Sequence, residues 1–321
     1  MATSGSQNYK QTRNQVMLDA LQLIGVYGIG RTASAEDMEL AQNTLNKMIK
    51  AWGAKGLHLW TKKEGVVFLT PYTASYKLGS ASGDAHATNE DDLVVTQLNG
   101  AHVSGATTLT LDSTTNMAVS DYIGIVTTDK TVHWTTISTI PSSTSVTIAS
   151  GLDSAASDNG IVYAYTTKLY KPLRILDARM RSGIDSGATS TEVDSILSAS
   201  SYQEYHQFLN KTTNGSPTLY SYEPKNLNGT FSLYPRPTDG AERVMISYER
   251  TMEDMDEASN DFDFPSEWLE PLTWQLAVRL APMFGKSQKL TTILPLASTM
   301  LENLLDWNTE ITTITMSPEF E

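Results

Sequence analysis

The chain contains no cysteine among its 321 residues. Without thiols, the protein cannot form disulfide bonds, thiolate zinc sites or iron–sulfur clusters, and it has no cysteine nucleophile. Histidine is also scarce, and no two histidines have the i, i+4 spacing of a metal site on a helix. We therefore expect neither a metal nor a cofactor to be bound. The histidines are His58, His86, His102, His133 and His206.

Long hydrophobic runs are missing as well. No segment approaches the roughly 18 consecutive apolar residues that span a bilayer, so we expect no membrane span. The opening residues, MATSGSQNYKQTRNQ, lack the apolar stretch of a secretory signal. The chain is therefore expected to mature in the compartment where it is made.

Positive charge is in short supply, because 23 Lys and Arg residues are outnumbered by 36 Asp and Glu residues, for a formal net charge of −13. Proteins that bind nucleic acid normally show the opposite sign, with Lys and Arg clustered on one face. Tight DNA binding that is independent of sequence is thus excluded as the default interpretation. An acidic wall would still let a DNA duplex slide past without being held.

The chain does contain a clear succession of periodic segments. Apolar residues between Val16 and Ile24, and again between Met38 and Trp52, recur every three or four positions, which predicts two helices. Ser34 is expected to cap the second helix, with Asp37 at the spacing of a capping box. The apolar run Val66–Leu69 then predicts a strand.

From Ser80 to Tyr165, small polar residues dominate and short β-like runs alternate with turn clusters. This pattern predicts a small all-β barrel or sandwich. Closely spaced loop ends tolerate such a unit as an insertion. The β-like runs are DLVVT, TTLTL, DYIGIV, VHWTTI, SVTI and IVYAY.

Mixed structure is expected after the β-rich stretch. KPLRILDARMR predicts a strand, and Ser201 with Glu204 predicts a short capped helix. The segment FDFPSEWLEPLTWQLAVRLAPMFG is interpreted as a helix entrance capped by Ser266, with either an irregular first turn or a regular helix that starts at Pro271. A second amphipathic helix follows. Between the short capped helix and the helix that follows Pro265, three strands are expected to form a meander: GSPTLYSYEP, GTFSLYPRP and RVMISYER.

Together, the segments predict an α+β fold with a helical-bundle core, a small antiparallel sheet, an inserted all-β domain and an extended C-terminal tail. The expected divisions are the N-terminal helices and strands of the core (1–79), the inserted β domain (80–166), the rest of the core (167–310) and the tail (311–321).

No motif specifies a catalytic site, and we expect the protein not to be an enzyme. A flexible acidic loop does not fix the separation of roughly 5 to 9.5 Å between two carboxyl groups that a glycoside hydrolase needs. GVYGIGRT follows a predicted helix, not a strand, so it does not support dinucleotide binding. The loop carboxylates are Glu253, Asp254, Asp256, Glu257, Asp261 and Asp263. A basic cluster has two open interpretations, phosphate contact or salt bridging: Lys168, Lys171, Arg174, Arg179 and Arg181.

The order of these segments resembles the head-completion proteins of short-tailed bacteriophages, also called tail accessory or packaged-DNA stabilisation proteins. The resemblance spans about residues 11–310 and rests on the order of many modest motifs, not on a single signature. DYIGIVTTDKTVHWTTISTI resembles the β insertion of longer members. The other segments that resemble the family are TRNQVMLDALQLIG, NKMIKAWGAKGLHLW, GVVFLTPYTASYKLG, YKPLRILDARMR, SYQEYHQFLNKTTNGSPTLYSY, GTFSLYPRP, ISYERTMEDMD and FPSEWLEPLTWQLAVRLAPMFG.

The resemblance implies a structural adaptor at the head–tail junction of the virion, assembled in the bacterial host cytoplasm. Such an adaptor forms a homo-oligomeric ring, expected to be a dodecamer, beneath the portal ring. It extends the channel, retains packaged DNA that passes without tight binding, and docks a downstream tail protein such as a hub, nozzle, fibre or spike. By the same analogy, the tail from about Ile311 docks on the portal by strand addition. The expected docking residues are Ile311, Ile314, Met316 and Phe320.

Two other functions remain open at this point. A peptidoglycan hydrolase of the virion would use a pair of the loop carboxylates. A host- or carbohydrate-binding module would stack sugars on aromatic residues of the β insertion, although their period-two placement makes them mostly core. These aromatic residues are Tyr122, Trp134, Tyr163 and Tyr165.

Overall fold

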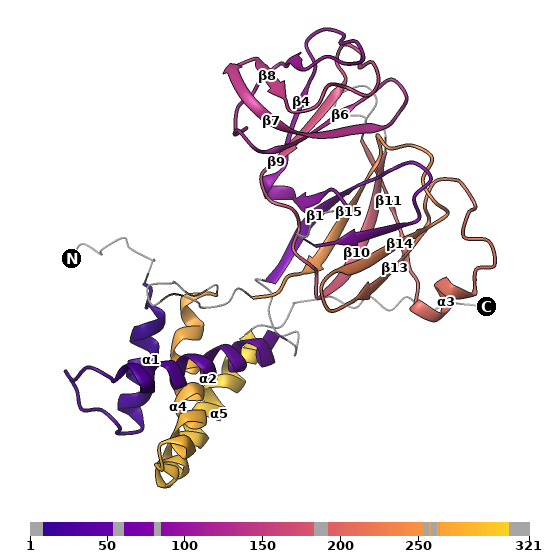
Figure 1. Cartoon of the computed structure of the whole chain (residues 1–321). Coiled ribbons are helices and arrows are strands. Elements are labelled where there is room, and N and C mark those ends of the chain that lie inside the picture. Colours follow the sequence, from indigo (N-terminus) through magenta and orange to yellow (C-terminus); the bar gives the residue numbers. More distant parts are fainter. Residues whose placement is uncertain are drawn as a thin grey trace, which may run out of the picture. The chain divides into compact units, whose positions relative to one another are not determined.

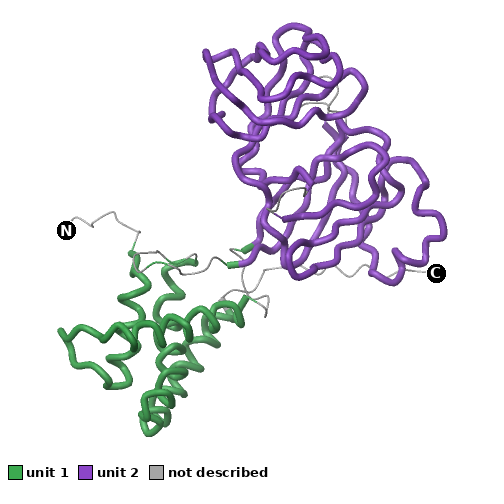
Figure 2. The backbone as a smooth tube through the Cα atoms, viewed as in Figure 1, with its two compact units in different colours: residues 1–61, 252–321 green, residues 62–251 purple. Residues whose placement is uncertain are grey.

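The computed structural model describes residues 9–53, 61–79, 85–182, 192–252, 257, 262 and 264–307. The chain divides into two compact units (Figure 2). One unit combines Met1–Thr61 with Met252–Glu321, and the other is the continuous segment Lys62–Thr251. We call them the helical unit and the β unit.

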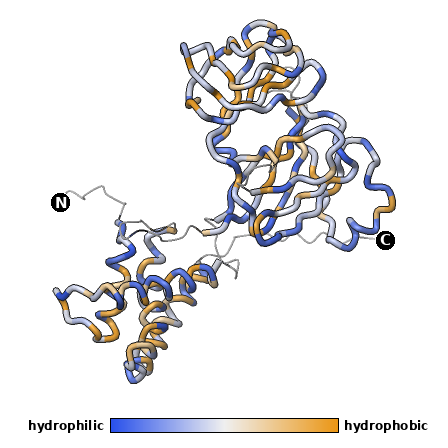
Figure 3. The backbone as a smooth tube through the Cα atoms, in the orientation of Figure 1, coloured by the Kyte–Doolittle hydropathy of each residue, from blue (hydrophilic) through white to orange (hydrophobic). Residues whose placement is uncertain are grey.

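The helical unit is built from the two ends of the chain. Its helices α1, α2, α4 and α5 share one apolar core, and Figure 3 shows apolar residues concentrated along α4 and α5. Trp52 and Trp268 meet edge to face with ring centroids 5.8 Å apart. Ser34 caps α2 as predicted, because its Oγ accepts a hydrogen bond from the amide of Asp37 at 3.2 Å. The helices are α1 (Arg13–Leu23), α2 (Ala35–Gly53), α4 (Leu269–Met283) and α5 (Leu290–Trp307).

The helix entrance at Pro265 has an irregular first turn, one of the two predicted alternatives. A 3-10 turn, η5 (Ser266–Trp268), precedes α4, and Pro271 lies within the first turn of α4. Ser266 is not the N-cap of the regular helix, because it is itself the first residue of the 3-10 turn. Trp268 is buried in the helical core, so this stretch is a packing element.

Two sheets of the β unit share an apolar core. A five-stranded sheet runs in the order β11-β10-β15-β1-β3, and a four-stranded sheet runs in the order β12-β13-β14-β2 (Figure 1). Residues of both sheets contribute to the core, among them Val67 and Ile246 of the first and Phe231 and Leu233 of the second. The strands of the five-stranded sheet are β11 (Val193–Ile196), β10 (Arg174–Ser182), β15 (Arg243–Glu249), β1 (Lys62–Phe68) and β3 (Ala87–Asn89). The other sheet contains β12 (Ser198–Ala199), β13 (Leu219–Pro224), β14 (Gly229–Tyr234) and β2 (Ser75–Leu78).

A six-stranded antiparallel sheet in the order β4-β9-β6-β7-β8-β5 encloses a third core. An isolated bridge between Leu98 and Leu111 joins residues that follow its first and last strands, so the sheet curls towards a small barrel. Gly124 is required opposite Trp134, because a Cβ there would come within 2.6 Å of the indole ring. The strands are β4 (Val94–Gln97), β5 (Thr108–Thr110), β6 (Tyr122–Val126), β7 (Val132–Ser142), β8 (Ser145–Ile148) and β9 (Ile161–Tyr165).

Strand β1 shows why the run Val66–Leu69 is apolar without alternation. Val67 faces the core shared with the four-stranded sheet, whereas Val66 and Phe68 pack with Tyr163 of β9 in a separate cluster. Because both faces of the strand are covered, successive residues are all buried.

The predicted helical-bundle core is wrong, because most of the described structure is β, in three sheets, and the helices form a unit of their own. The three-strand meander is also wrong, because β15 leaves β14 and pairs with β1 and β10. The partner of β14 at that edge is β2. Periodicity identified these strands, but pairing between distant segments is decided by which apolar faces cover one another. The divisions predicted at 79/80, 166/167 and 310/311 stay predictions.

Candidate functional site

The predicted docking residues Ile311, Ile314, Met316 and Phe320 lie outside the described residues, so their role stays a prediction. The same holds for the carboxylates of the acidic loop, of which only Glu257 is described, as an exposed residue.

The arginines of the predicted basic cluster form ion pairs across the five-stranded sheet. Arg174 donates two hydrogen bonds to the carboxylate of Glu249, at 2.8 and 2.6 Å, and Arg181 donates two to Asp194, at 2.7 and 2.9 Å. The bonds from Arg181 hold the pKa of the Asp194 carboxyl below its usual value. The described contacts therefore favour salt bridging over phosphate contact. The third arginine, Arg179, contacts three carboxylates: Glu64, Asp177 and Asp194.

One carboxyl next to this network, that of Glu90, has a raised pKa. A hydrogen bond that the protonated Glu90 carboxyl donates to the side chain of Glu64, together with burial and the nearby negative charge of Glu64, raises the pKa of Glu90. The two groups belong to strand β1 and to the 3-10 turn η2 (Glu90–Asp92). Neither belongs to the loop on which the hydrolase alternative depends.

The aromatic residues considered for sugar stacking lie between two sheets of the β unit. Tyr163 and Tyr165 are buried against Phe68 of β1, with ring centroids 4.8 and 6.2 Å away, so neither presents a ring to solvent. Trp134 is half-buried and stacks on His86 at 4.0 Å between centroids, and the hydroxyl of Tyr165 lies 2.6 Å from His86 Nδ1. Burial, with a smaller effect of the Lys168 charge, lowers the pKa of His86 to about 4.

This cluster is therefore a structural contact between the five- and six-stranded sheets. His133, the neighbour of Trp134, is buried and lies 2.7 Å from a carboxylate oxygen of Asp153. Of the pair His133 and Trp134, the histidine thus points more deeply into the protein.

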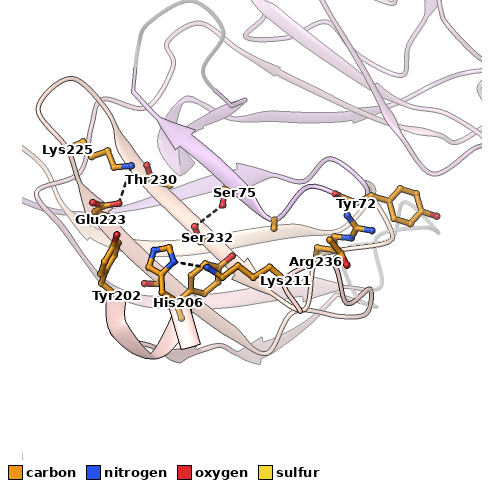
Figure 4. A pocket seen from close by; sticks show the side chains of 14 residues that line it. Tyr72, Ser75, Tyr202, His206, Lys211, Glu223, Lys225, Thr230, Ser232 and Arg236 are labelled. Atoms are coloured by element: carbon orange, nitrogen blue, oxygen red, sulfur yellow. Dashed lines mark hydrogen bonds and ion pairs between the residues drawn. The ribbon is translucent and has the colours of Figure 1, made fainter. Parts of the chain in front are cut away.

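The open face of the four-stranded sheet carries a groove that the sequence did not reveal. Its volume is about 550 Å³, within the roughly 300–1,000 Å³ of typical ligand sites. Side chains on alternate positions of β13, β14 and β2 form its floor: Ser221 and Glu223, Thr230 and Ser232, and Ser75. The rim comes from α3 (Tyr202–Gln207), the loop after it, Tyr72 and Arg236 (Figure 4).

Hydrogen bonds hold the groove in shape. The hydroxyls of Ser75 and Ser232 lie 2.9 Å apart across two strands. Ser201 and Glu204 form the predicted capping box at the start of α3, which places Tyr202, Tyr205 and His206 at the rim.

Cations and tyrosine rings lie together around this floor. Lys211 Nζ donates to His206 Nδ1 at 2.7 Å and lies 5.0 Å from the ring centre of Tyr205. Arg236 donates to the carbonyl of Tyr72 at 3.4 Å and lies over its ring at 5.8 Å. The signal in the sequence was the period-two alternation of hydroxyl and apolar residues in YSY and TFSLY, but it does not show that these strands are neighbours.

Within the ranges that the structure describes, no helix is long and apolar enough to cross a membrane. The same ranges contain no group of three or more acidic or histidine side chains placed to hold a metal ion.

The chain matches the family model described as SU10 adaptor protein over residues 90–308. The matched range begins after α1 and α2 and includes the six-stranded sheet, most of the remaining β unit, and α4 and α5. No curated protein matches the chain. The match covers more than half of the sequence and confirms the resemblance to phage head-to-tail adaptors. The chain therefore belongs to the SU10 adaptor protein family.

Proposed function

We propose that the protein is a structural component of a phage virion that forms a ring beneath the portal and connects it to the tail. The observation that supports this proposal is the family match over residues 90–308, which includes parts of both compact units. The ring would extend the DNA channel, retain the packaged DNA and dock a downstream tail protein. A dodecamer is the expected state of the ring, and no catalytic step is part of this role.

The net charge of −13 supports a channel protein that does not hold DNA tightly, because like charges repel the phosphate backbone. The absence of cysteine suits assembly in the reducing host cytoplasm. Docking on the portal is assigned to the segment from Ile311 onward, with Ile314, Met316 and Phe320 as its apolar contacts.

Sedimentation velocity tests the proposal with the purified chain alone and mixed with the portal ring of the same phage. The free chain is expected to sediment as a monomer or weak oligomer. In the mixture it should move with the ring and saturate at a fixed number of copies, whereas a chain that ends at Glu310 should stay free. Absence of binding by the intact chain would contradict the adaptor function, and binding by both forms would contradict only the docking tail.

A second function, cell-wall hydrolysis, has no supporting contact among the described residues. A zymogram with substitutions across the loop carboxylates Glu253–Asp263 separates the two functions. Clearing of peptidoglycan that disappears with one of these substitutions would favour the hydrolase.

A further inference from the structure

The groove on the four-stranded sheet has a charge balance opposite to that of the whole chain. Among the described residues, its lining includes Lys211, Lys225 and Arg236 but only one carboxylate, Glu223, although acidic residues outnumber basic ones in the sequence. Lys225 pairs with Glu223 at 3.1 Å, so these two charges offset each other. Lys211 and Arg236 remain as the excess positive charge, which favours a ligand that carries negative charge.

Both cations have donors to spare. An ammonium group has three N–H donors and a guanidinium group has five. Lys211 uses one donor on His206. Arg236 uses one on Asn214 and one on the carbonyl of Tyr72. The remaining N–H groups can bind a carboxylate, and in Figure 4 both side chains lie on the rim of the groove.

The rest of the lining is hydroxyl-rich and aromatic. Tyr202 is 56% exposed, with its ring packed edge-on against His206 at 4.2 Å between centroids, so one surface of the phenol is accessible. Of the lining residues that the structure describes, Ala74 is the one aliphatic residue, so these residues offer no apolar pocket for a peptide side chain. The floor hydroxyls are those of Ser75, Ser221, Thr230 and Ser232.

These features favour a saccharide over a peptide or a nucleic acid. A sugar ring has an apolar face that packs on an aromatic ring and hydroxyls that exchange hydrogen bonds with Ser and Thr. A nucleic acid needs a track of cations along its phosphates, whereas two excess cations in one groove of an acidic protein match a short ligand with few charges. We propose that this groove binds an acidic oligosaccharide, with a sugar ring on Tyr202 and a carboxylate bound by Lys211 and Arg236.

Isothermal titration calorimetry of the full chain at low ionic strength tests the proposal, with trigalacturonic and triguluronic acid as probes. We expect at least one of them to bind. Lys211→Gln and Arg236→Gln should each weaken binding by about 10-fold or more, because each removes a charge-assisted hydrogen bond. Tyr202→Ala should also weaken it. The matched control is Lys286→Gln, which removes an equal charge from an exposed position of the helical unit that does not line the groove and should leave the affinity unchanged.

Three further probes decide between ligand classes. Maltotriose, which is neutral, should bind much more weakly than the uronic acids, and equal binding would contradict the role of the cations. Hexaglutamate or oligothymidylate that binds more tightly than both uronic acids, with the same dependence on Lys211 and Arg236, would overturn the proposal. The proposal would also be overturned if neither uronic acid, at millimolar concentration, gave heat in calorimetry or chemical shift changes in an NMR titration.

The proposal is independent of the adaptor function. Lys211→Gln should still move with the portal ring in sedimentation, so loss of saccharide binding and loss of portal binding are separate results. Circular dichroism of each variant confirms that it is folded, and little change is expected because Tyr202 is exposed and the two cations lie at the rim.

Discussion

Replacement of Trp268 by alanine should unfold the helical unit and leave the β unit intact. Trp268 is 2% exposed and is the largest fully buried side chain described. It precedes α4 and contacts Trp52 at the end of α2, so it joins two halves of a unit that lie far apart in the sequence. Its loss would remove a contact that connects the N-terminal and C-terminal helices.

The expected cost follows from the buried area. A buried aromatic side chain covers about 150–250 Å², which at roughly 25 cal/mol per Å² amounts to about 4–6 kcal/mol as an upper bound. Substitutions of this kind are measured at about 3–5 kcal/mol. Since whole domains are stable by only about 5–15 kcal/mol, Trp268→Ala should leave the helical unit partly unfolded at room temperature.

Urea unfolding followed by far-ultraviolet circular dichroism at the helical minimum, and limited proteolysis with peptide mapping, measure the effect. Cleavage should appear in α1, α2, α4 and α5 before it appears in the β strands. Trp274→Ala is the matched control, because Trp274 lies on α4 but is only half-buried, and it should cost clearly less. If Trp268→Ala shifts a single transition of the whole chain, or exposes the β strands first, the division into two units is refuted.

Three further outcomes are expected. Glu249→Gln should destabilise the five-stranded sheet by about 1–3 kcal/mol, because it breaks a two-bond ion pair with Arg174; a double-mutant cycle with Arg174→Gln measures the coupling, and additive effects would contradict the interaction. Gly124→Ala should cost about 1–3 kcal/mol through its clash with the Trp134 ring, whereas Gly28→Ala, which meets no atom within 4 Å, should be nearly neutral in thermal unfolding. The His86 imidazole should titrate at about 4 in an NMR pH titration. Because the pKa of His86 is lower in the folded state, the unfolded chain takes up the proton first as the pH falls. The free energy of unfolding should therefore decrease as the pH falls from about 6.5 to about 4. A midpoint near 6.5 would show that His86 is solvated.

The sequence predicted the types of elements better than their arrangement. The helix that Ser34 caps and the capping box of Ser201 and Glu204 depend on residues a few positions apart, and the structure confirms them. The irregular turn after Pro265 is one of the two alternatives that the sequence left open. The local sequence is sufficient to predict these features, because each hydrogen bond joins residues within one helical turn.

The pairing of strands that are far apart in the sequence could not be predicted from such local patterns. The third strand of the expected meander, β15, pairs with β1, although about 180 residues separate Val67 from its partner Val244. Its residues Val244–Ile246 are apolar without alternation because both faces are covered, and a single sequence does not say by which segments. The groove was missed for the same kind of reason, since Tyr72, Tyr202 and Arg236 come together through the pairing of β14 with β2 and with β13 in the four-stranded sheet.

The two halves of the helical unit lie on either side of the β unit in the sequence, and this determines the order in which the two units can fold during translation. When α2 leaves the ribosome, about 200 residues remain to be made before α4 appears. At roughly 5–20 residues per second, this takes on the order of 10–40 s. The β unit, whose residues are continuous, can fold within that interval. The apolar faces of α1 and α2 stay uncovered until α4 and α5 have been synthesised. The helical unit can therefore be complete only after the last strand of the β unit has been made.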